Sequence, residues 1–167
     1  MLLYILRHGT AEERGPDWPD DAMRPLTAEG KQKTRDAARG LRALEPAIGI
    51  VLTSPFTRAK QTARLLADEL GIDPTRVKET MALAAGADPE AIWRAVREAG
   101  RSSGVLLVGH EPDLGRLVSW LISGDTRASI PLKKAGLACV ELEAGETGPR
   151  GSLRFLLTPA QLRALAR

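Results

Sequence analysis

The chain has 167 residues, 43% hydrophobic and 27% charged, which fits one globular domain and excludes a disordered or fibrous protein. Its single cysteine excludes an internal disulfide framework and a cysteine-rich zinc site. The net charge of +3 and the pI near 9.3 permit a nucleic-acid partner, but Lys133–Lys134 is the only adjacent basic pair and aromatic residues make up just 4%. We therefore expect no nucleic-acid partner, and a small anionic group such as phosphate suits a few placed arginines better.

The apolar stretch Leu2–Leu6 resembles neither a signal peptide nor a membrane span. No charged region precedes it, and it ends at Arg7. Nothing in the chain approaches the roughly 18 uncharged apolar residues of a transmembrane helix. We expect a cytoplasmic protein without a membrane partner.

The first part of the chain predicts a strand, a loop and a helix. Leu2–Leu6 is an all-apolar run bounded by charge, as expected for a strand covered on both faces. Residues 9–26 are polar and contain several prolines, which favours a loop. Thr27 is the expected N-cap of a helix to about Leu44. Its apolar stripe comprises Ala37, Ala38, Leu41 and Leu44.

A second strand and helix follow. Ile48–Leu52 is the next apolar run. Ser54 and Pro55 come directly after it, and serine as N-cap with proline at the first helical position predicts a helix start. This helix ends at Gly71, and its inward residues are Ala59, Ala63, Leu66, Ala67 and Leu70.

The middle of the chain continues the alternation. We expect a weak strand at Arg76–Thr80, a helix at Pro89–Ala99 and a short buried strand at Val105–Val108. The segment after His110 has the spacing of an amphipathic helix. Its apolar positions are Leu114, Leu117, Val118, Leu121 and Ile122.

The last part predicts two strands at 136–143 and 152–157, a turn through Gly145–Gly151, and a closing helix at Pro159–Arg167. Strands that alternate with helices indicate the α/β class. We expect residues 1–167 to form one domain, a three-layer α/β/α sandwich with a mostly parallel central sheet.

Both histidines of the chain directly follow predicted strands, His8 after the first and His110 after the fourth. Ligands of parallel α/β sheets bind outside the carboxyl ends of the strands. Histidine changes charge near neutral pH and can act as a nucleophile. A lone histidine more often merely caps a strand, but two at one edge of the sheet favour a functional site.

The strand that ends at Thr53 leads into a predicted helix N-terminus, where free N–H groups and the helix dipole favour an anion. Arg58 lies in its first turn, and Arg7 stands beside His8. Arginine is the preferred partner where the oxygens of an anion are held bidentately. The alternatives are a solvated helix charge for Arg58 and a strand-end salt bridge for Arg7.

Four motifs in this order resemble those of the histidine phosphatase (phosphoglycerate mutase-like) superfamily. They are Leu6–Glu12, Arg24–Gly30, Ser54–Thr62 and Val108–Pro112, and the resemblance covers the chain to about residue 123. An Arg-His-Gly triplet alone is a weak match, whereas four ordered motifs at strand ends are specific. The short chain and the Arg-Pro-Leu-Thr and Ser-Pro-Phe forms are most similar to the SixA-type phosphohistidine phosphatases.

The resemblance implies a phosphoglycerate mutase-like fold and a phosphatase that works through a phosphohistidine intermediate. His8 would attack phosphorus, while Arg7, Arg58 and His110 hold the phosphoryl oxygens. Two nearby guanidinium groups disfavour the protonated imidazole, and attack needs the neutral one. Phosphoryl transfer consists chiefly of positioning and charge neutralisation. We therefore expect no cofactor and no metal.

The sequence departs from the family where ester-cleaving members carry a glutamate that protonates the leaving group. The stretch Thr80–Asp88 resembles that segment and places Ala82 where the acid would be, with Glu79 as the alternative. General acid catalysis contributes about 10²–10⁴-fold, and an alkoxide leaves poorly without it. An imidazole departs more easily, so the missing acid predicts cleavage of P–N rather than P–O bonds.

Five further residues receive lesser roles. Gly9 is expected to let backbone approach the phosphate. Glu111 and Glu12 are candidates near the substrate or solvated carboxylates, and Arg24 braces the loop or adds to the phosphate site. Cys139 has no basic neighbour in its predicted strand, which favours a core residue over a second nucleophile.

The expected partner is a protein that carries phosphohistidine, or else a small phosphorylated substrate. The short loop 9–26 suits an open site for a phosphorylated side chain. A small-molecule phosphomonoesterase is the alternative, and a mutase is less favoured because it must enclose its substrate. A non-catalytic phosphate-binding module would lack the nucleophile, and a metal-dependent hydrolase would need more clustered ligands.

Overall fold

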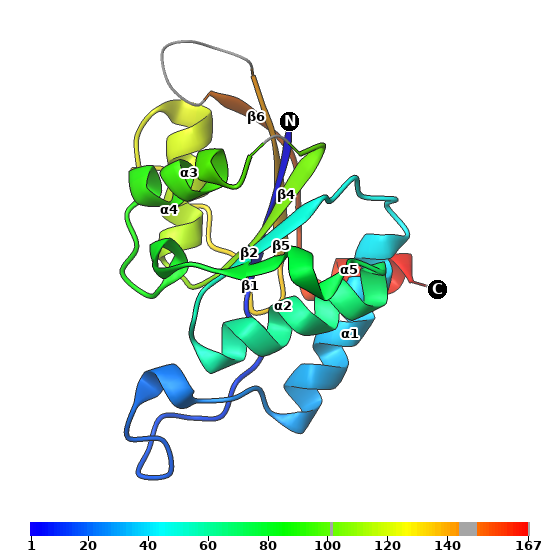
Figure 1. The fold of residues 1–167 in the computed structure, drawn as a ribbon, viewed down its shortest axis with the longest axis vertical. Helices are drawn as coiled ribbons and strands as arrows, with labels where there is room; N and C mark the ends of the chain where they lie inside the picture. The colour runs from blue at the N-terminus through cyan, green and yellow to red at the C-terminus, as the bar shows by residue number, and fades with distance from the viewer. Residues whose placement is uncertain (101, 144–149, 167) are drawn as a thin grey trace.

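The computed structural model describes residues 1–100, 102–143 and 150–166. In this part of the chain six strands form one sheet in the order β3-β2-β4-β1-β5-β6 (Figure 1). β1, β2, β3 and β4 are parallel, β5 is antiparallel to β1, and β6 is antiparallel to β5. The strands are β1 Leu2–Arg7, β2 Ile50–Thr53, β3 Val77–Glu79, β4 Gly104–Gly109, β5 Leu137–Leu142 and β6 Gly151–Leu157.

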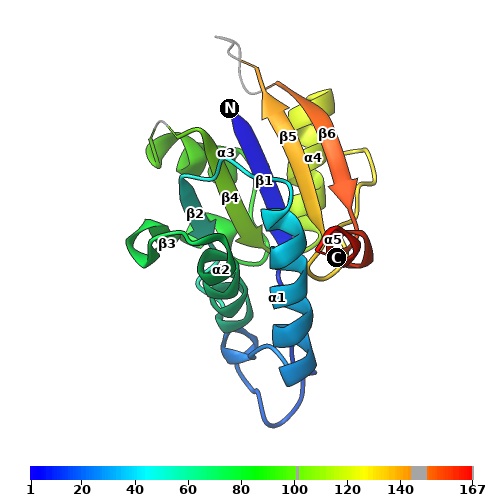
Figure 2. The same cartoon turned by 90° about the vertical axis from the view of Figure 1, so that its right-hand side faces the viewer.

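Helices cover both faces of the sheet, and α1, α2 and α5 lie in front of it in Figure 2. α3 and α4 pack on the other face. The α-helices are α1 Ala28–Arg42, α2 Thr57–Leu70, α3 Pro89–Glu98, α4 Asp113–Ser123 and α5 Pro159–Leu165. Three 3₁₀ turns accompany them, η1 Asp21–Met23, η2 Pro74–Arg76 and η3 Met81–Leu83. The predicted three-layer α/β/α sandwich is therefore confirmed.

Two apolar cores explain why the sheet is covered twice. Successive side chains of a strand point to opposite faces. Leu3 and Ile5 of β1 join the core under α3 and α4, whereas Tyr4 and Leu6 join the core under α1, α2 and α5. Cys139 of β5 lies in the second core, and burial raises its thiol pKa to about 11. Its prediction as a core residue is confirmed.

Several predicted boundaries change. α1 ends at Arg42, and Leu44 is exposed rather than part of the apolar stripe. The predicted turn Gly145–Gly151 lies mostly outside the described residues, and Gly151 itself begins β6. The loop 9–26 contains η1 and a β-bridge between Ala11 and Leu26.

The predicted start of α2 was wrong. The helix begins at Thr57 with Phe56 as N-cap, and Phe56 offers no side-chain hydrogen bond. Ser54 therefore does not cap the helix, although its Oγ accepts a hydrogen bond from the Phe56 N–H at 3.2 Å. The change follows from a second partner of Ser54, described below. Throughout the described residues, no helix has the length and apolar character needed to cross a bilayer.

Candidate active site

The two histidines and Arg58 meet at the carboxyl ends of β1, β2 and β4. The rings of His8 and His110 lie 5.1 Å apart between centroids. The Arg58 Nε lies 3.3 Å from the His8 Nε2. All three side chains are buried, with exposures of 3% to 6%. The sheet thus brings together residues that are up to 102 positions apart, as their places at parallel strand ends predict.

Hydrogen bonds fix the tautomer of His8. Its Nδ1 lies 2.7 Å from the Gly9 carbonyl oxygen, which can only accept, so Nδ1 carries the proton. The Arg58 Nε–H can only donate, so Nε2 accepts. The neutral imidazole therefore presents the Nε2 lone pair to the centre of the cluster.

His110 has one partner and one free nitrogen. Its Nε2 lies 2.8 Å from Ser54 Oγ. Because the Phe56 N–H donates to that oxygen, the Ser54 hydroxyl proton can point to His110 Nε2. In that arrangement Nε2 is the acceptor, and the one N–H proton of the neutral His110 ring is on Nδ1. Within the described residues this buried Nδ1 has no hydrogen-bond partner. The Phe56 ring packs 4.9 Å from the His110 ring and helps to orient it.

Arg7 stands at the end of β1, where Nη1 donates to the Leu132 carbonyl at 3.0 Å. Its buried Nε has no partner in the described part of the chain. Buried polar atoms normally find one, because leaving a donor unpaired costs about 1–3 kcal/mol. Among the residues that the structure describes, Arg7 Nε and His110 Nδ1 are the only buried side-chain nitrogen or oxygen atoms in this state.

The cluster keeps both imidazoles neutral. The pKa of His8 falls to about 3, chiefly through burial; the charges of His110, Arg58 and Arg7 also lower it, and the hydrogen bond with Gly9 opposes them. The pKa of His110 falls to about 4, again chiefly through burial and next through Arg58. The neutral imidazole expected at position 8 therefore follows mainly from desolvation, and the neighbouring charges, including the two guanidiniums, contribute less.

These shifts predict a loss of stability in mild acid. Below the usual histidine pKa of 6.5, both histidines are protonated in the unfolded chain but stay neutral in the folded protein. Unfolding therefore becomes more favourable as the pH falls towards 4. Between pH 7 and 5 each histidine should lower the free energy of unfolding by about 2 kcal/mol. Urea unfolding at the two pH values measures this.

The His8→Asn variant isolates the contribution of one imidazole, because its amide N–H can still bond the Gly9 carbonyl. Its loss of stability between pH 7 and 5 should be smaller than that of the unmodified protein by about 2 kcal/mol. An equal loss in both proteins would mean that the folded protein protonates His8 as readily as the unfolded chain does.

Asp21 is a site residue that the sequence analysis missed. Its Oδ2 accepts from Arg58 Nη2 at 2.9 Å, and its carbonyl accepts from Arg58 Nη1 at 2.7 Å. Burial alone raises the Asp21 pKa, but hydrogen bonds from Arg24 and Arg58 outweigh it and hold the pKa at about 2. Arg24 also donates to the Glu12 carbonyl, so it braces the loop as the first of its two predicted roles requires. The loop 9–26 thus folds against the site through η1.

Gly9 has a packing reason for its identity. A Cβ there would lie 2.3 Å from Thr34 Oγ1 of α1, which is closer than two non-bonded atoms can approach without a steric clash. Its N–H already donates to Thr62 Oγ1 at 3.0 Å, and Thr62 in turn donates to the Arg58 carbonyl. Gly9 therefore ties β1 to α1 and α2, and its approach to a phosphate stays a prediction.

Glu111 holds a neighbouring turn. Its carboxylate accepts from the Leu132 N–H at 3.2 Å, and burial raises its pKa. Leu132 is the residue whose carbonyl accepts from Arg7. This geometry makes Glu111 a positioning residue for Arg7, while direct contact with substrate stays a prediction.

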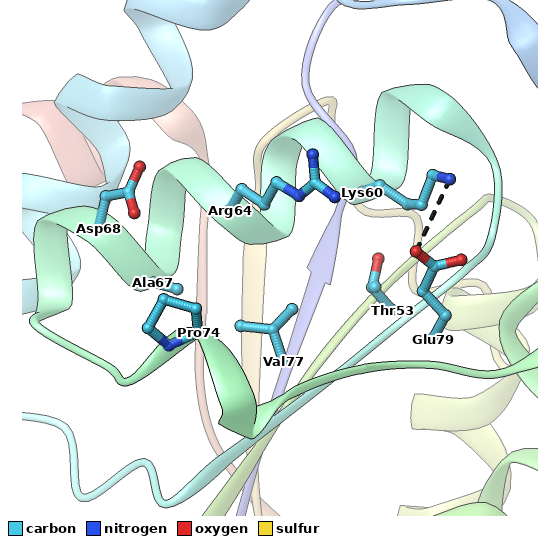
Figure 3. A pocket seen from close by; sticks show the side chains of 8 residues that line it. All are labelled: Thr53, Lys60, Arg64, Ala67, Asp68, Pro74, Val77 and Glu79. Atoms are coloured by element: carbon cyan, nitrogen blue, oxygen red, sulfur yellow. Dashed lines mark ion pairs between the residues drawn. The ribbon is translucent and has the colours of Figure 1, made fainter.

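The two candidates for a general acid lie in different surroundings. Ala82 belongs to η3, and a Cβ on Gly109 would touch the neighbouring Leu83, so η3 lies beside the end of β4. Glu79 forms an ion pair with Lys60 at 3.6 Å, on the rim of a hollow of about 290 Å³ between α2 and β3 (Figure 3). Within the described residues, no hydrogen bond or ion pair joins Glu79 to the histidines or Arg58. The described chain also holds no group of three or more His, Cys, Asp or Glu side chains that could bind a metal ion.

Fold and site together define an α/β protein with two buried histidines and a buried arginine at the ends of its parallel strands. The model of the histidine phosphatase superfamily (branch 1) matches residues 3–88, slightly more than half of the chain. The chain belongs to this superfamily, and the resemblance read from its motifs is confirmed.

Particular relatives place it beside the SixA proteins. The phosphohistidine phosphatase SixA of Escherichia coli (strain K12) is 32% identical over 166 residues, which cover 98% of this chain and 97% of the relative. The structure of the protein histidine phosphatase SixA complexed with tungstate superposes with a TM-score of 0.82 at 30% identity, covering 97% of this chain and 99% of the other. The structure of the α-ribazole phosphatase from Shigella flexneri shares the fold at a TM-score of 0.73, with 17% identity and coverage of 95% of this chain and 97% of the other.

Proposed function

We propose that this protein is a metal-independent phosphatase that removes the phosphoryl group from phosphohistidine in a protein, through a covalent intermediate on His8. The observation that carries the proposal is the pair of buried unpaired nitrogens, Arg7 Nε and His110 Nδ1. Both belong to the three residues, Arg7, Arg58 and His110, that are predicted to hold phosphoryl oxygens. Oxygens of a bound phosphoryl group would satisfy both donors.

In the first step the Nε2 lone pair of His8 attacks phosphorus and the P–N bond of the substrate breaks. The bonding electrons go to the nitrogen of the leaving imidazole, which departs as a neutral ring if its other nitrogen is protonated. Arg58 Nε–H would turn from His8 Nε2 to a phosphoryl oxygen as the new bond forms. The N-terminus of α2, whose N-cap Phe56 supplies no side-chain acceptor, adds backbone donors.

In the second step water attacks the phosphorus of phospho-His8. The P–Nε2 bond breaks, its electrons return to Nε2, and the product leaves as H₂PO₄⁻, with one proton of the water on the added oxygen and the other on a second phosphate oxygen. The Gly9 carbonyl keeps Nδ1 protonated throughout, so the imidazole returns to its starting tautomer. Fixed positive charge around the equatorial oxygens is the main source of acceleration in such transfers.

Two observations favour phosphohistidine over a phosphate ester as the substrate: Ala82 stands where ester-cleaving members of the family carry a general acid, and the chain is similar to SixA over its full length. Ala82 cannot protonate an alkoxide, and Glu79 is engaged with Lys60. The full-length similarity to SixA supports the same substrate class, and tungstate in the SixA structure is a tetrahedral oxyanion like phosphate. The alternative is a small-molecule phosphomonoesterase, and the shared fold of the α-ribazole phosphatase from Shigella flexneri is compatible with it.

A side-by-side rate comparison tests the proposal. The substrates are a phosphohistidine peptide, phosphoramidate and a sugar phosphate, each with and without EDTA. We expect kcat/KM to be highest on the peptide and lowest on the sugar phosphate, and EDTA to leave all rates unchanged. The highest kcat/KM on the sugar phosphate would favour the phosphomonoesterase, and loss of activity with EDTA would exclude the metal-free mechanism.

Replacing Ala82 by glutamate should change the preference between leaving groups. A carboxylic acid there could protonate a departing alkoxide, so hydrolysis of an alkyl phosphate should rise by about tenfold or more, within the usual range for general acids. Phosphoramidate hydrolysis should change much less. The matched control is Ala82→Gln, which has similar size but no proton to give, and an equal effect of Ala82→Glu on both substrates would contradict the leaving-group argument.

A further inference from the structure

A groove of about 360 Å³ opens beside the candidate active site, on the face of the sheet that carries α1 and α5. Its walls are α1, α5 and the turn that precedes β5, which lie together at the lower part of Figure 2. Arg7 belongs to the lining, so the groove borders the phosphate site. We call it the basic groove, since its lining contains the five cations Arg7, Lys33, Lys133, Lys134 and Arg163.

The basic groove concentrates charge that the protein does not neutralise. Five cations and no carboxylate line it, although the whole chain has a net charge of only +3. Lys33 pairs with Glu29 on its own helix. In the described part of the chain Lys133, Lys134 and Arg163 have no ion-pair partner. Like charges gathered in one hollow raise its positive potential and attract an anionic partner.

The turn of the basic groove is bonded directly to the nucleophile's backbone. The Ala135 N–H is shared between the Arg7 carbonyl at 3.0 Å and the His8 carbonyl at 3.2 Å. Arg7 N–H donates in return to the Gly136 carbonyl at 3.1 Å. Ala135 has φ 59°, a left-handed conformation that is unfavourable for a non-glycine residue. These bonds hold the main chain of the turn that carries Lys133 and Lys134 beside His8.

The opposite wall is attached to the same segment. The Thr27 N–H, at the start of α1, donates to the Thr10 carbonyl at 3.1 Å. α5 is pressed against α1 at Gly40, where a Cβ would lie 1.7 Å from the Leu162 carbonyl oxygen. Both walls therefore keep their position relative to residues 7–10.

We propose that the basic groove binds an acidic segment of the phosphorylated protein substrate, next to its phosphohistidine. The inference rests on the proposed function and narrows its substrate class. The cations come from separate segments of the chain, and Lys33, Lys133 and Lys134 are exposed. They therefore offer charges along an open groove, which suits aspartate and glutamate side chains of an extended chain. Complementary charge of this kind raises the rate of encounter and discriminates between partners.

The test uses two synthetic phosphohistidine peptides that differ only in three flanking glutamates, replaced by glutamines in the second peptide. At low ionic strength kcat/KM should be about tenfold higher for the acidic peptide. The double variant Lys133→Glu/Lys134→Glu should abolish or invert this ratio. Raising the salt concentration to about 0.2 M should reduce it in the unmodified protein.

The control variant is Arg94→Glu/Arg97→Glu on α3, which makes the same charge change on the other face of the sheet. It should keep the tenfold preference for the acidic peptide. If both double variants lost this preference equally, the preference would depend only on the net charge of the protein, and the proposal that the basic groove binds the acidic segment would be wrong.

Phosphoramidate hydrolysis distinguishes an error in the proposed docking role of the basic groove from an error in the proposed phosphatase function. Hydrolysis of phosphoramidate and of both peptides at equal kcat/KM would contradict the docking role but leave the phosphatase function supported. No hydrolysis of any phosphoramidate or phosphohistidine substrate would overturn the proposed function itself. If Lys133→Glu/Lys134→Glu slowed phosphoramidate as much as the acidic peptide, the lysines would serve the phosphoryl site, and docking of a segment would be excluded.

Discussion

Turnover of phosphohistidine peptide and of phosphoramidate should fall by at least about 10³-fold when His8 is replaced by alanine, the order of effect seen when an enzyme loses its nucleophile. The reason is geometric, because the unprotonated Nε2 of His8 lies next to Arg58, and the ring of His110 lies close to the ring of His8. Initial rates measured by phosphate release check this. Retention of a tenth of the original rate would exclude His8 as the nucleophile.

Covalent labelling separates loss of the nucleophile from general damage. Brief incubation with ³²P-labelled substrate and quenching in alkali should leave label on the unmodified protein and none on His8→Ala. The His110→Gln variant serves as the matched control, since it also removes a buried imidazole of the same cluster but leaves His8 in place. It should still become labelled, at a lower rate. Label on His8→Ala would show that another residue carries the phosphoryl group.

The second large effect should follow from Arg58→Ala. Removing a preorganised donor from a charge-stabilising site costs about 10²–10³ in kcat, or about 2.7–4 kcal/mol. The Arg58 guanidinium is buried and lies against His8 on one side and Asp21 on the other, so water cannot readily replace it. Steady-state kinetics on the phosphohistidine peptide measure the loss, and an unchanged kcat/KM would mean that Arg58 does not contact the transferring group.

Two further variants serve as controls for the effect of Arg58→Ala. Arg64→Ala removes an exposed arginine of the same helix and should leave kcat/KM unchanged. Arg58→Lys keeps a positive charge but loses the planar fork, so it should recover part of the lost rate and no more. Circular dichroism of each variant checks that the overall helix content is unchanged. If lysine restored full activity, the bidentate geometry would be dispensable.

The proximity of His8, His110 and Arg58 could be predicted because its signal is local. A polar residue directly after a run such as Leu2–Leu6 or Val105–Val108 marks a strand end, and parallel strands bring their ends to one edge. The paired apolar faces of these strands predict the two covering layers in the same way. Fold and central cluster therefore needed only patterns that extend over a few residues.

Asp21 and Ser54 needed contacts that no local pattern contains. Asp21 lies among several polar residues of the loop 9–26, and only the path of η1 brings it to Arg58, 37 positions away. Ser54 beside Pro55 fits an N-cap, but its Oγ serves His110, 56 positions away. The tertiary contact overrode the local preference and moved the helix start to Thr57. Leu44 follows the last helical turn, so its place in the apolar stripe had no helix to support it.

The hydrogen bond between His8 Nδ1 and the Gly9 carbonyl would also decide the regiochemistry of the proposed phosphohistidine intermediate. Because Nδ1, the ring nitrogen nearer the backbone, holds its proton, we expect the adduct to form as the tele isomer, with phosphorus on Nε2. A single short main-chain contact would thus select the isomer of the phosphoenzyme, and ³¹P NMR of the trapped adduct measures which isomer forms.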